Sequence, residues 1–316
     1  MEILHKNSNI RLIFFTLIFT SLIFILQNES LADRDAYLSW INNIEMITDS
    51  SHKGSKLIYF IAEPLWNYLL LSLKWIFTEP KAVITILNLT VGTLTAFSVL
   101  KNSKRDLIFS LLLVVNIFTL SSSINHIRSG LAMSLVLITF DYPNFNKSFI
   151  SRMIRFMAFF IHMGTIFFIF IDYFQFIIDK FNNFFGRYAS FLLGLITLIS
   201  SNLFFLILTK YAPTVETTSG RGSFIGFAFY FLILILIIFS KVNERNKNYI
   251  SIIVLSTYLS FYYTYPPIGR LLEMGYPFLI ITILNIGSNY RNLIYYLFLA
   301  GNIFGLMLNY NLLYVK

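Results

Sequence analysis

The 316-residue sequence contains no cysteine, which excludes disulfides, thiolate nucleophiles and cysteine-based metal sites. It also lacks a glycine-rich phosphate-binding loop, a His-Glu-x-x-His motif and a Gly-x-Ser-x-Gly motif, so no motif of a soluble enzyme is present. Neither His126 nor His162 has neighbours at metal-ligand spacing. We therefore expect neither a metal nor a cofactor.

Charged residues are also scarce, at 12% of the chain, whereas hydrophobic residues make up 57%. Continuous apolar runs recur from end to end and do not alternate with polar residues as barrel strands do. The composition therefore predicts an all-α polytopic membrane protein whose surroundings are the lipid bilayer. Lys and Arg in short loops between the runs supply the net charge of +9, which is typical of orientation signals and does not indicate a nucleic-acid partner.

We predict a single integral membrane domain over residues 1–316, with about eleven transmembrane helices. The first, at about 10–26, follows Lys6 and Arg11, and we interpret it as an uncleaved helix and not as a signal peptide. Outer loops are expected at about 27–80 and 210–222. The other helices are expected at about 81–100, 107–121, 124–141, 149–162, 163–179, 188–209, 223–240, 249–264, 268–287 and 293–312.

The segment 57–77 decides the topology. If it spans the membrane, the basic cluster at 101–105 falls outside, against the positive-inside tendency. If it lies on the outer surface or re-enters, that cluster and the later basic loops are cytoplasmic. We adopt the second interpretation, in which 57–77 is one outer-surface or re-entrant helix beside the transmembrane helices, and which places the N-terminus inside and the C-terminus outside. The pair 149–162 and 163–179 is short for two full spans, so one or both are expected to be tilted, broken or re-entrant.

Under this topology, polar residues gather at the outer face around the stretch Ser121–Ser134. Asn125, His126 and Arg128 open a helix there, and a charge at membrane depth is costly and usually functional. The other polar residues expected on the same side are Asp33, Asp35, Glu63, His162, Arg221, Arg270 and Glu273.

These residue types favour recognition of phosphate on a lipid carrier. The planar donor fork of arginine suits phosphate and stays charged when partly desolvated. We therefore expect Arg128 and Arg270 to neutralise a diphosphate leaving group, with Arg221 assisting. Asn125 and His126 are candidates for substrate binding. An acceptor hydroxyl would need a general base, for which the candidates are His162, Asp35 and Glu63.

Simpler interpretations exist for each of these residues. Arg128 can cap a helix end or extend to the interface, and Arg270 can pair with Glu273. His162 can be a hydrogen-bonded interface histidine. Asp33 and Asp35 are by default solvated or at a helix N-cap. Asp172, within a predicted helix, has no assigned role.

Asn125 to Ala132 resembles the Asn-x-x-Arg-x-x-Leu-Ala helix start of the EpsG-like, Wzy-type polysaccharide polymerases. Further motifs similar to those of the family follow in the same order along the chain. They are Asp35-Ala36-Tyr37, Glu63-Pro64, His162, and Arg270 with Tyr276. One position departs from the pattern, because Ser129 stands where the family often has Gln.

The resemblance implies an integral glycosyltransferase of the bacterial inner membrane, with a fold related to the membrane-embedded enzymes that use lipid-linked donors. It implies that a growing O-antigen or capsule glycan passes from undecaprenyl diphosphate to a new lipid-linked repeat unit at the periplasmic face. The expected partners are those lipid-linked oligosaccharides and a chain-length regulator.

Two other classes of function compete with this one. A flippase of lipid-linked oligosaccharide would show internal repeats and charges near the midplane, whereas no repeat is visible and the polar cluster lies toward one face. A scaffold or an acyl transferase is the other alternative. Acyl transfer would need His and Asp together, but His162 and Asp172 are ten residues apart. We therefore favour the polymerase.

Overall fold

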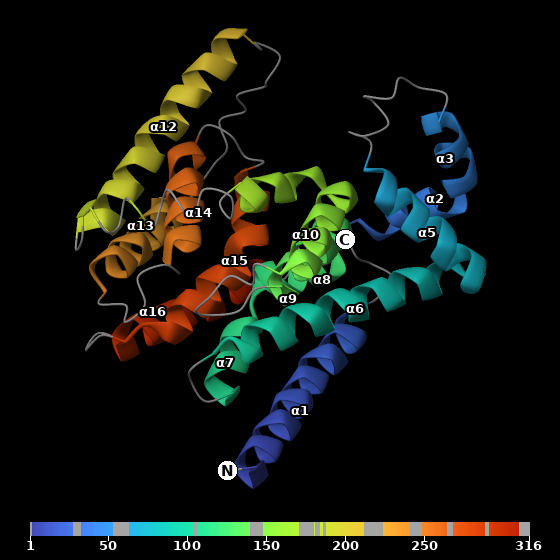
Figure 1. Cartoon of the computed structure of the whole chain (residues 1–316), viewed down its shortest axis with the longest axis horizontal. Coiled ribbons are helices and arrows are strands. Elements are labelled where there is room, and N and C mark those ends of the chain that lie inside the picture. Colours follow the sequence, from blue (N-terminus) through green and yellow to red (C-terminus); the bar gives the residue numbers. More distant parts are fainter. Residues whose placement is uncertain are drawn as a thin grey trace. The chain divides into compact units, whose positions relative to one another are not determined.

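The structure, a computed structural model, is built from helices, and no strand occurs in the part of the chain that it describes (Figure 1). That part comprises residues 2–27, 33–52, 63–103, 107–139, 148–170, 180, 184–185, 188–211, 224–240, 248–263, 268–287 and 291–309.

The chain forms two compact units. Unit 1 comprises Met1–Phe170 and Asn302–Lys316, and unit 2 comprises Ile171–Gly301. This division does not test the single membrane domain expected over 1–316, which stays a prediction.

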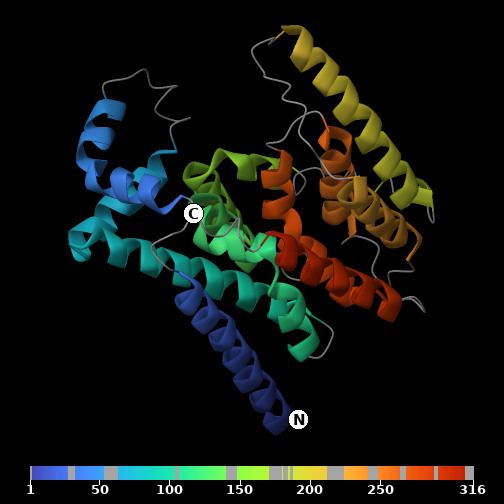
Figure 2. The ribbon, with the colours of Figure 1, turned by 180° about the vertical axis from the view of Figure 1, so that it is seen from behind.

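Unit 1 is organised around one long helix, α6. α6 packs against α1, α8 and α9, and in both views it runs between α1 on one side and α8 and α9 on the other (Figures 1 and 2). A Cβ on Gly92 of α6 would lie 2.9 Å from Ile23 Cγ1, so the glycine lets α1 approach closely. The elements of unit 1 are α1 (Glu2–Leu26), α2 (Arg34–Asn42), α3 (Ile44–His52), α5 (Pro64–Ile76), α6 (Pro80–Lys101), α7 (Leu107–Val114), α8 (Ile117–Ile124), α9 (Ile127–Ile138), α10 (Phe149–Ile161), the 3-10 helix η1 (Met163–Thr165) and the end of α16 (Arg291–Asn309).

The helix expected at 107–121 is broken into α7 and α8, which meet at a bend of 66°. Asn116 causes the break, because its side-chain oxygen accepts hydrogen bonds from the N–H groups of Phe118 and Thr119 and so caps α8. A second break at Asn125 and His126 separates α8 from α9. The chain therefore turns twice within the run that leads to Arg128.

The outer segment expected at 27–80 contains two helices, α2 and α3, in its polar first part, and α5 falls where the surface or re-entrant helix was expected, at 57–77. Its helices α2, α3 and α5 form because apolar side chains recur on one face and are buried, among them Tyr37, Ile41, Ile44 and Trp66. α5 is 13 residues long, or about 20 Å at 1.5 Å per residue. Since the hydrocarbon core is about 30 Å thick, this length favours a helix that lies on the surface or re-enters.

Unit 2 contains α12 (Ala189–Tyr211), α13 (Phe224–Phe239), α14 (Asn248–Phe261), α15 (Ile268–Asn285) and most of α16. α14 packs against α12, α13 and α15. Gly275 of α15 faces Val254 of α14 so closely that a Cβ would lie 2.6 Å from Val254 Cγ1. The predicted helices 81–100, 188–209, 223–240 and 268–287 agree with α6, α12, α13 and α15 to within two residues.

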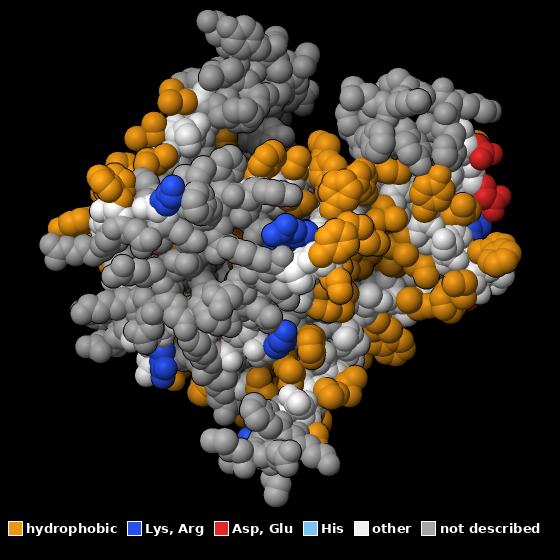
Figure 3. Space-filling view, in the orientation of Figure 1, with side chains coloured by type: hydrophobic (Ala, Val, Ile, Leu, Met, Phe, Trp, Pro, Cys, Tyr) orange, Lys and Arg blue, Asp and Glu red, His pale blue; other side chains and the backbone are white. Residues whose placement is uncertain are grey.

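Large apolar side chains cover much of the described surface (Figure 3). On α1 they include Ile13, Phe14 and Leu17, each more than half exposed. Among the described residues, three helices are long and apolar enough to cross a membrane, and the bent pair α7–α8 would make a fourth. Apolar helices of 10–17 residues add to these. The chain is therefore an all-α membrane protein, while the count of eleven spans stays a prediction.

Candidate active site

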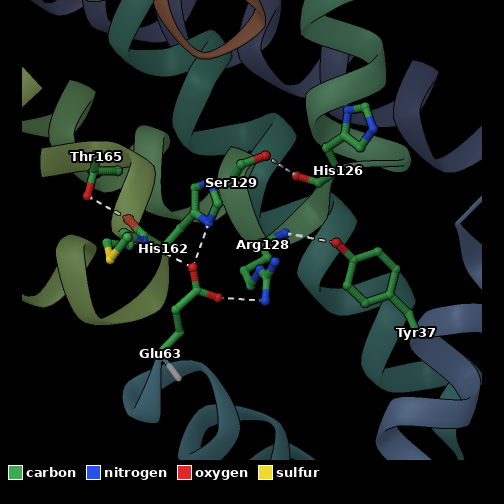
Figure 4. Close-up of polar contacts among 8 residues, drawn as sticks. Tyr37, Glu63, His126, Arg128, Ser129, His162 and Thr165 are labelled. Atoms are coloured by element: carbon green, nitrogen blue, oxygen red, sulfur yellow. Dashed lines mark hydrogen bonds and ion pairs between the residues drawn. The ribbon is translucent and has the colours of Figure 1, made fainter. Parts of the chain in front are cut away.

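Glu63 lies at the N-cap of α5 in a backbone conformation that side chains rarely adopt. Its φ is 55° and its ψ is 59°, and it is the one non-glycine residue with positive φ in the described part of the chain. Such a conformation costs ~1–3 kcal/mol and persists only where the surroundings enforce it. The Glu63 side chain does not cap its own helix. The turn instead directs the carboxylate towards α9 and α10 (Figure 4).

His162 follows α10 and meets this carboxylate. His162 Nδ1 lies 2.9 Å from Glu63 Oε1, and the backbone N–H of Met163 donates to the same oxygen at 3.0 Å. Because an ionised carboxylate only accepts hydrogen bonds, Nδ1 donates and Nε2 is left as the acceptor of the imidazole. The hydroxyl of Thr165 donates to the His162 carbonyl and fixes the turn into η1.

Arg128, in the first turn of α9, reaches the other oxygen of the same carboxylate. Its Nη1 lies 2.5 Å from Glu63 Oε2, and its side chain is 27% exposed. The backbone N–H of Arg128 donates to the Tyr37 hydroxyl at 3.4 Å. Figure 4 shows Arg128 and His162 converging on Glu63 from different helices. We call Glu63, Arg128 and His162 the carboxylate cluster.

The environment of Glu63 favours its ionised form. Burial by itself raises the pKa of the Glu63 carboxyl, but the hydrogen bond from His162, the charge of Arg128 and the N–H of Met163 outweigh it. The net result is a pKa below the ordinary value of 4.5. Glu63 therefore stays negative at neutral pH and keeps both its cationic and its imidazole partner.

Two other predicted residues lie beside the cluster. His126, at the N-cap of α9, has Nε2 at 3.6 Å from Asp33 Oδ2 and Nδ1 at 3.4 Å from Ser121 Oγ. Its ring points away from the Glu63 carboxylate (Figure 4). Asn125 is 5% exposed, and its side-chain oxygen has no hydrogen-bond partner in the described part of the chain. Ser129 donates to the His126 carbonyl and thus supports the start of α9.

The remaining predicted residues lie on α2, in unit 2 or outside the described residues. Asp35 is exposed on α2, and no contact among the described residues joins it to Glu63, Arg128 or His162. Arg270 is exposed in the first turn of α15 in unit 2, and Glu273 is buried one turn later. Arg221 and Asp172 lie outside the described residues.

Three aromatic residues, Tyr37, Trp40 and Trp66, lie beside Arg128, and we call them the aromatic wall. The sequence analysis singled out Tyr37 as part of a motif but neither tryptophan. The Arg128 guanidinium lies over the Trp40 ring, 5.1 Å from its centroid. Trp66 contacts Trp40 and Tyr37 edge to face, with ring centroids 6.3 and 6.1 Å apart. The spacing of Tyr37, Trp40 and Ile41 on a short amphipathic helix was the available signal.

The cluster combines an anion-binding cation with an imidazole oriented by a carboxylate. In such an arrangement the imidazole can accept a proton at Nε2 while the guanidinium stabilises negative charge. Among the described residues, no group of three or more His, Asp and Glu side chains is placed to hold a metal ion. The expectation that the reaction needs neither metal nor cofactor stays a prediction.

Comparison with known proteins gives one match. A family model described as EpsG family matches residues 12–314, which is nearly the whole chain. Neither the curated proteins nor the solved structures contain a match.

Proposed function

The chain belongs to the EpsG family, and we propose on this basis that it is a membrane glycosyltransferase that polymerises polysaccharide repeat units. Family membership suggests a polysaccharide-related polymerase or glycosyltransferase. The proposed donor is a growing O-antigen or capsule glycan on undecaprenyl diphosphate. The proposed acceptor is a new lipid-linked unit at the periplasmic face of the bacterial inner membrane.

The observation that carries the proposal is the single carboxylate shared by Arg128 and His162. Glu63 orients the imidazole through Nδ1, so Nε2 takes the proton of the acceptor hydroxyl. The acceptor oxygen then bonds to the anomeric carbon of the donor. The bond from that carbon to the diphosphate oxygen breaks, and the electron pair leaves with undecaprenyl diphosphate.

Negative charge grows on the diphosphate during this step, so cations are needed where it forms. The cations predicted from the sequence are Arg128 and Arg270, with Arg221 assisting, and Arg128 is the one that belongs to the carboxylate cluster. Asn125 and His126 contact the substrate beside Arg128. Asp35, the third base candidate from the sequence, is exposed, and the imidazole of His162 is favoured as the base because a carboxylate orients it.

The test is a deletion strain whose surface polysaccharide is profiled by gel electrophoresis. We expect lipid cores that carry a single repeat unit, with the long-chain ladder restored by the wild type. Arg128→Ala and His162→Ala should fail to restore it at equal protein levels. Arg152→Ala is the matched control, because Arg152 is exposed on α10, the helix that precedes His162.

Other outcomes discriminate between functions. If every repeat disappeared from the surface while lipid-linked units accumulated inside, the flippase alternative would replace the polymerase. An unchanged ladder in the deletion strain would reject both. Restoration of the ladder by Arg128→Ala would remove Arg128 from the site.

A further inference from the structure

Arg128 has two kinds of neighbour in the structure. One N–H group at the edge of its guanidinium pairs with Glu63, and the flat face of the guanidinium lies over Trp40. We propose that Trp40 is a positioning residue, which holds Arg128 by its face so that the remaining N–H edge is presented to the donor diphosphate. This inference rests on the proposed function and adds a residue to it.

The geometry fits a cation–π contact. The 5.1 Å from Arg128 Cζ to the Trp40 centroid lies within the roughly 6 Å over which the ring quadrupole attracts a cation. Tryptophan is the ring that gives the strongest such contact. Since a face contact and an edge contact use different parts of the guanidinium, Trp40 can keep its place while phosphate oxygens approach the edge.

Trp40 is itself fixed in place. Its ring meets Trp66, which is fully buried in α5, and Trp66 also meets Tyr37 of α2. The Tyr37 hydroxyl in turn accepts the backbone N–H of Arg128. The aromatic wall therefore restrains both the backbone and the guanidinium of Arg128, which lowers the conformational entropy lost when the arginine binds an anion.

A purely structural role for Trp40 makes a different prediction. If the indole only fills space, its electron density is irrelevant and any ring of the same shape serves. If it attracts the cation, each fluorine on the indole weakens the contact with almost no change in shape. Fluorinated tryptophans placed at position 40 alone separate these two cases.

The experiment measures the Kd of inorganic pyrophosphate for the full-length protein in lipid nanodiscs, at one fixed salt concentration. We expect the Kd to rise stepwise from tryptophan through mono-, di- and trifluorotryptophan at position 40. The total change should be roughly 2- to 30-fold, the range of a cation–π contact. The same series at Trp75, which is 90% exposed, is the control and should leave the Kd unchanged.

Arg128→Ala separates failure of this inference from failure of the proposed function. If Arg128→Ala weakens pyrophosphate binding but the Kd is flat across the fluorine series, Trp40 does not position Arg128 and only this inference falls. If Arg128→Ala leaves binding unchanged, Arg128 is not a diphosphate ligand, and the donor site falls together with it. A stepwise series at Trp40 with a flat series at Trp75 supports the proposal.

Discussion

At the scale of single residues, Glu63 combines three contacts with a strained backbone. One carboxylate oxygen pairs with the Arg128 guanidinium, and the other accepts hydrogen bonds from the His162 imidazole and the N–H of Met163. Pro64 follows at the first helical position, where its fixed φ suits the helix and its missing N–H costs nothing. The φ of 55° therefore accompanies a turn that aims the Glu63 carboxylate at Arg128 and His162, whose contacts help to hold it.

Replacing Glu63 by glutamine should abolish most polymer formation while leaving the protein folded. Glutamine keeps the shape but removes the charge that orients His162 and pairs with Arg128, so we expect a loss of roughly 10²-fold or more. The rate of chain extension in membranes containing the variant measures this. Glu45→Gln is the control, since the Glu45 side chain is 75% exposed and pairs with Lys74, away from the carboxylate cluster. Equal losses in both variants would contradict a special role for Glu63.

The lowered pKa of Glu63 also predicts how stability depends on pH. A group whose pKa is lower in the folded than in the unfolded state stabilises the fold above its ordinary pKa, here 4.5. That contribution disappears as the pH falls through the folded-state value. The Tm of the wild type should therefore exceed that of Glu63→Gln from pH 7 down to about 5, and the difference should shrink below pH 4.5. A difference that grew on acidification would show the opposite sign of shift.

At the scale of elements, the breaks on either side of α8 place Arg128. The turn at Asn125 and His126 brings α8 back against α9, and Gly130 makes this packing possible. A Cβ on Gly130 would clash with the backbone oxygen of Ser122. Since the obstacle is backbone, a larger residue cannot be accommodated by a change of rotamer.

Gly130→Ala should therefore lower the Tm and displace the start of α9. We expect a loss of several degrees, because most buried-site substitutions cost about 0.5–3 kcal/mol. Gly305→Ala is the matched control in the same unit, because the nearest atom that a Cβ there meets among the described residues is on Ile117, at an ordinary 3.9 Å. Thermal unfolding of detergent-solubilised protein compares the two. Equal Tm values would mean that α8 and α9 separate without cost.

The elements also show how far the sequence could predict this fold. Long apolar runs predicted the ends of α6, α12, α13 and α15 to within two residues, because the length of such a helix follows directly from the length of its apolar run. The bend at Asn116 was missed because one polar residue within an apolar run is compatible with a continuous helix. The cap becomes visible only when its side chain is seen to accept from Phe118 and Thr119.

The candidate site was predicted in part for a similar reason. Glu63, Arg128 and His162 were expected on one face of the membrane, but no spacing rule joins Glu63 to residues that lie 65 and 99 positions further along the chain. The Glu63 carboxylate contacts both Arg128 and His162 because of the way α5, α9 and α10 pack together, and a sequence pattern does not show this packing. The contact between Trp40 and Arg128 was missed because the segment around Trp40 was expected to be a loop, and in a loop the spacing of aromatic residues carries no information.

At the scale of the whole molecule, the distribution of polarity is that of a protein surrounded by lipid. Polar side chains such as Asn88, Ser98 and Ser110 are buried inside unit 1, whereas Ile13, Phe14 and Leu17 are exposed. Where water is absent, such groups bond to one another, as Ser110 does with Ser103 and as the Asn88 amide does by donating to Gln27. The predicted topology, with the basic loops inside, predicts that the carboxylate cluster lies at the outer face.

The absence of cysteine makes that orientation directly testable. Asp49 is exposed on α3, and Lys101 ends α6, whose 22 residues span about 33 Å and can cross the hydrocarbon core. In spheroplasts, a membrane-impermeant maleimide should label Asp49→Cys at once and Lys101→Cys only after the membrane is permeabilised. The cysteine-free wild type should give no signal.

Labelling of Lys101→Cys from outside would mean that 57–77 spans the membrane. The basic cluster at 101–105 would then lie outside, against the positive-inside tendency, and the shared orientation of Glu63, Arg128 and His162 would have to be derived again.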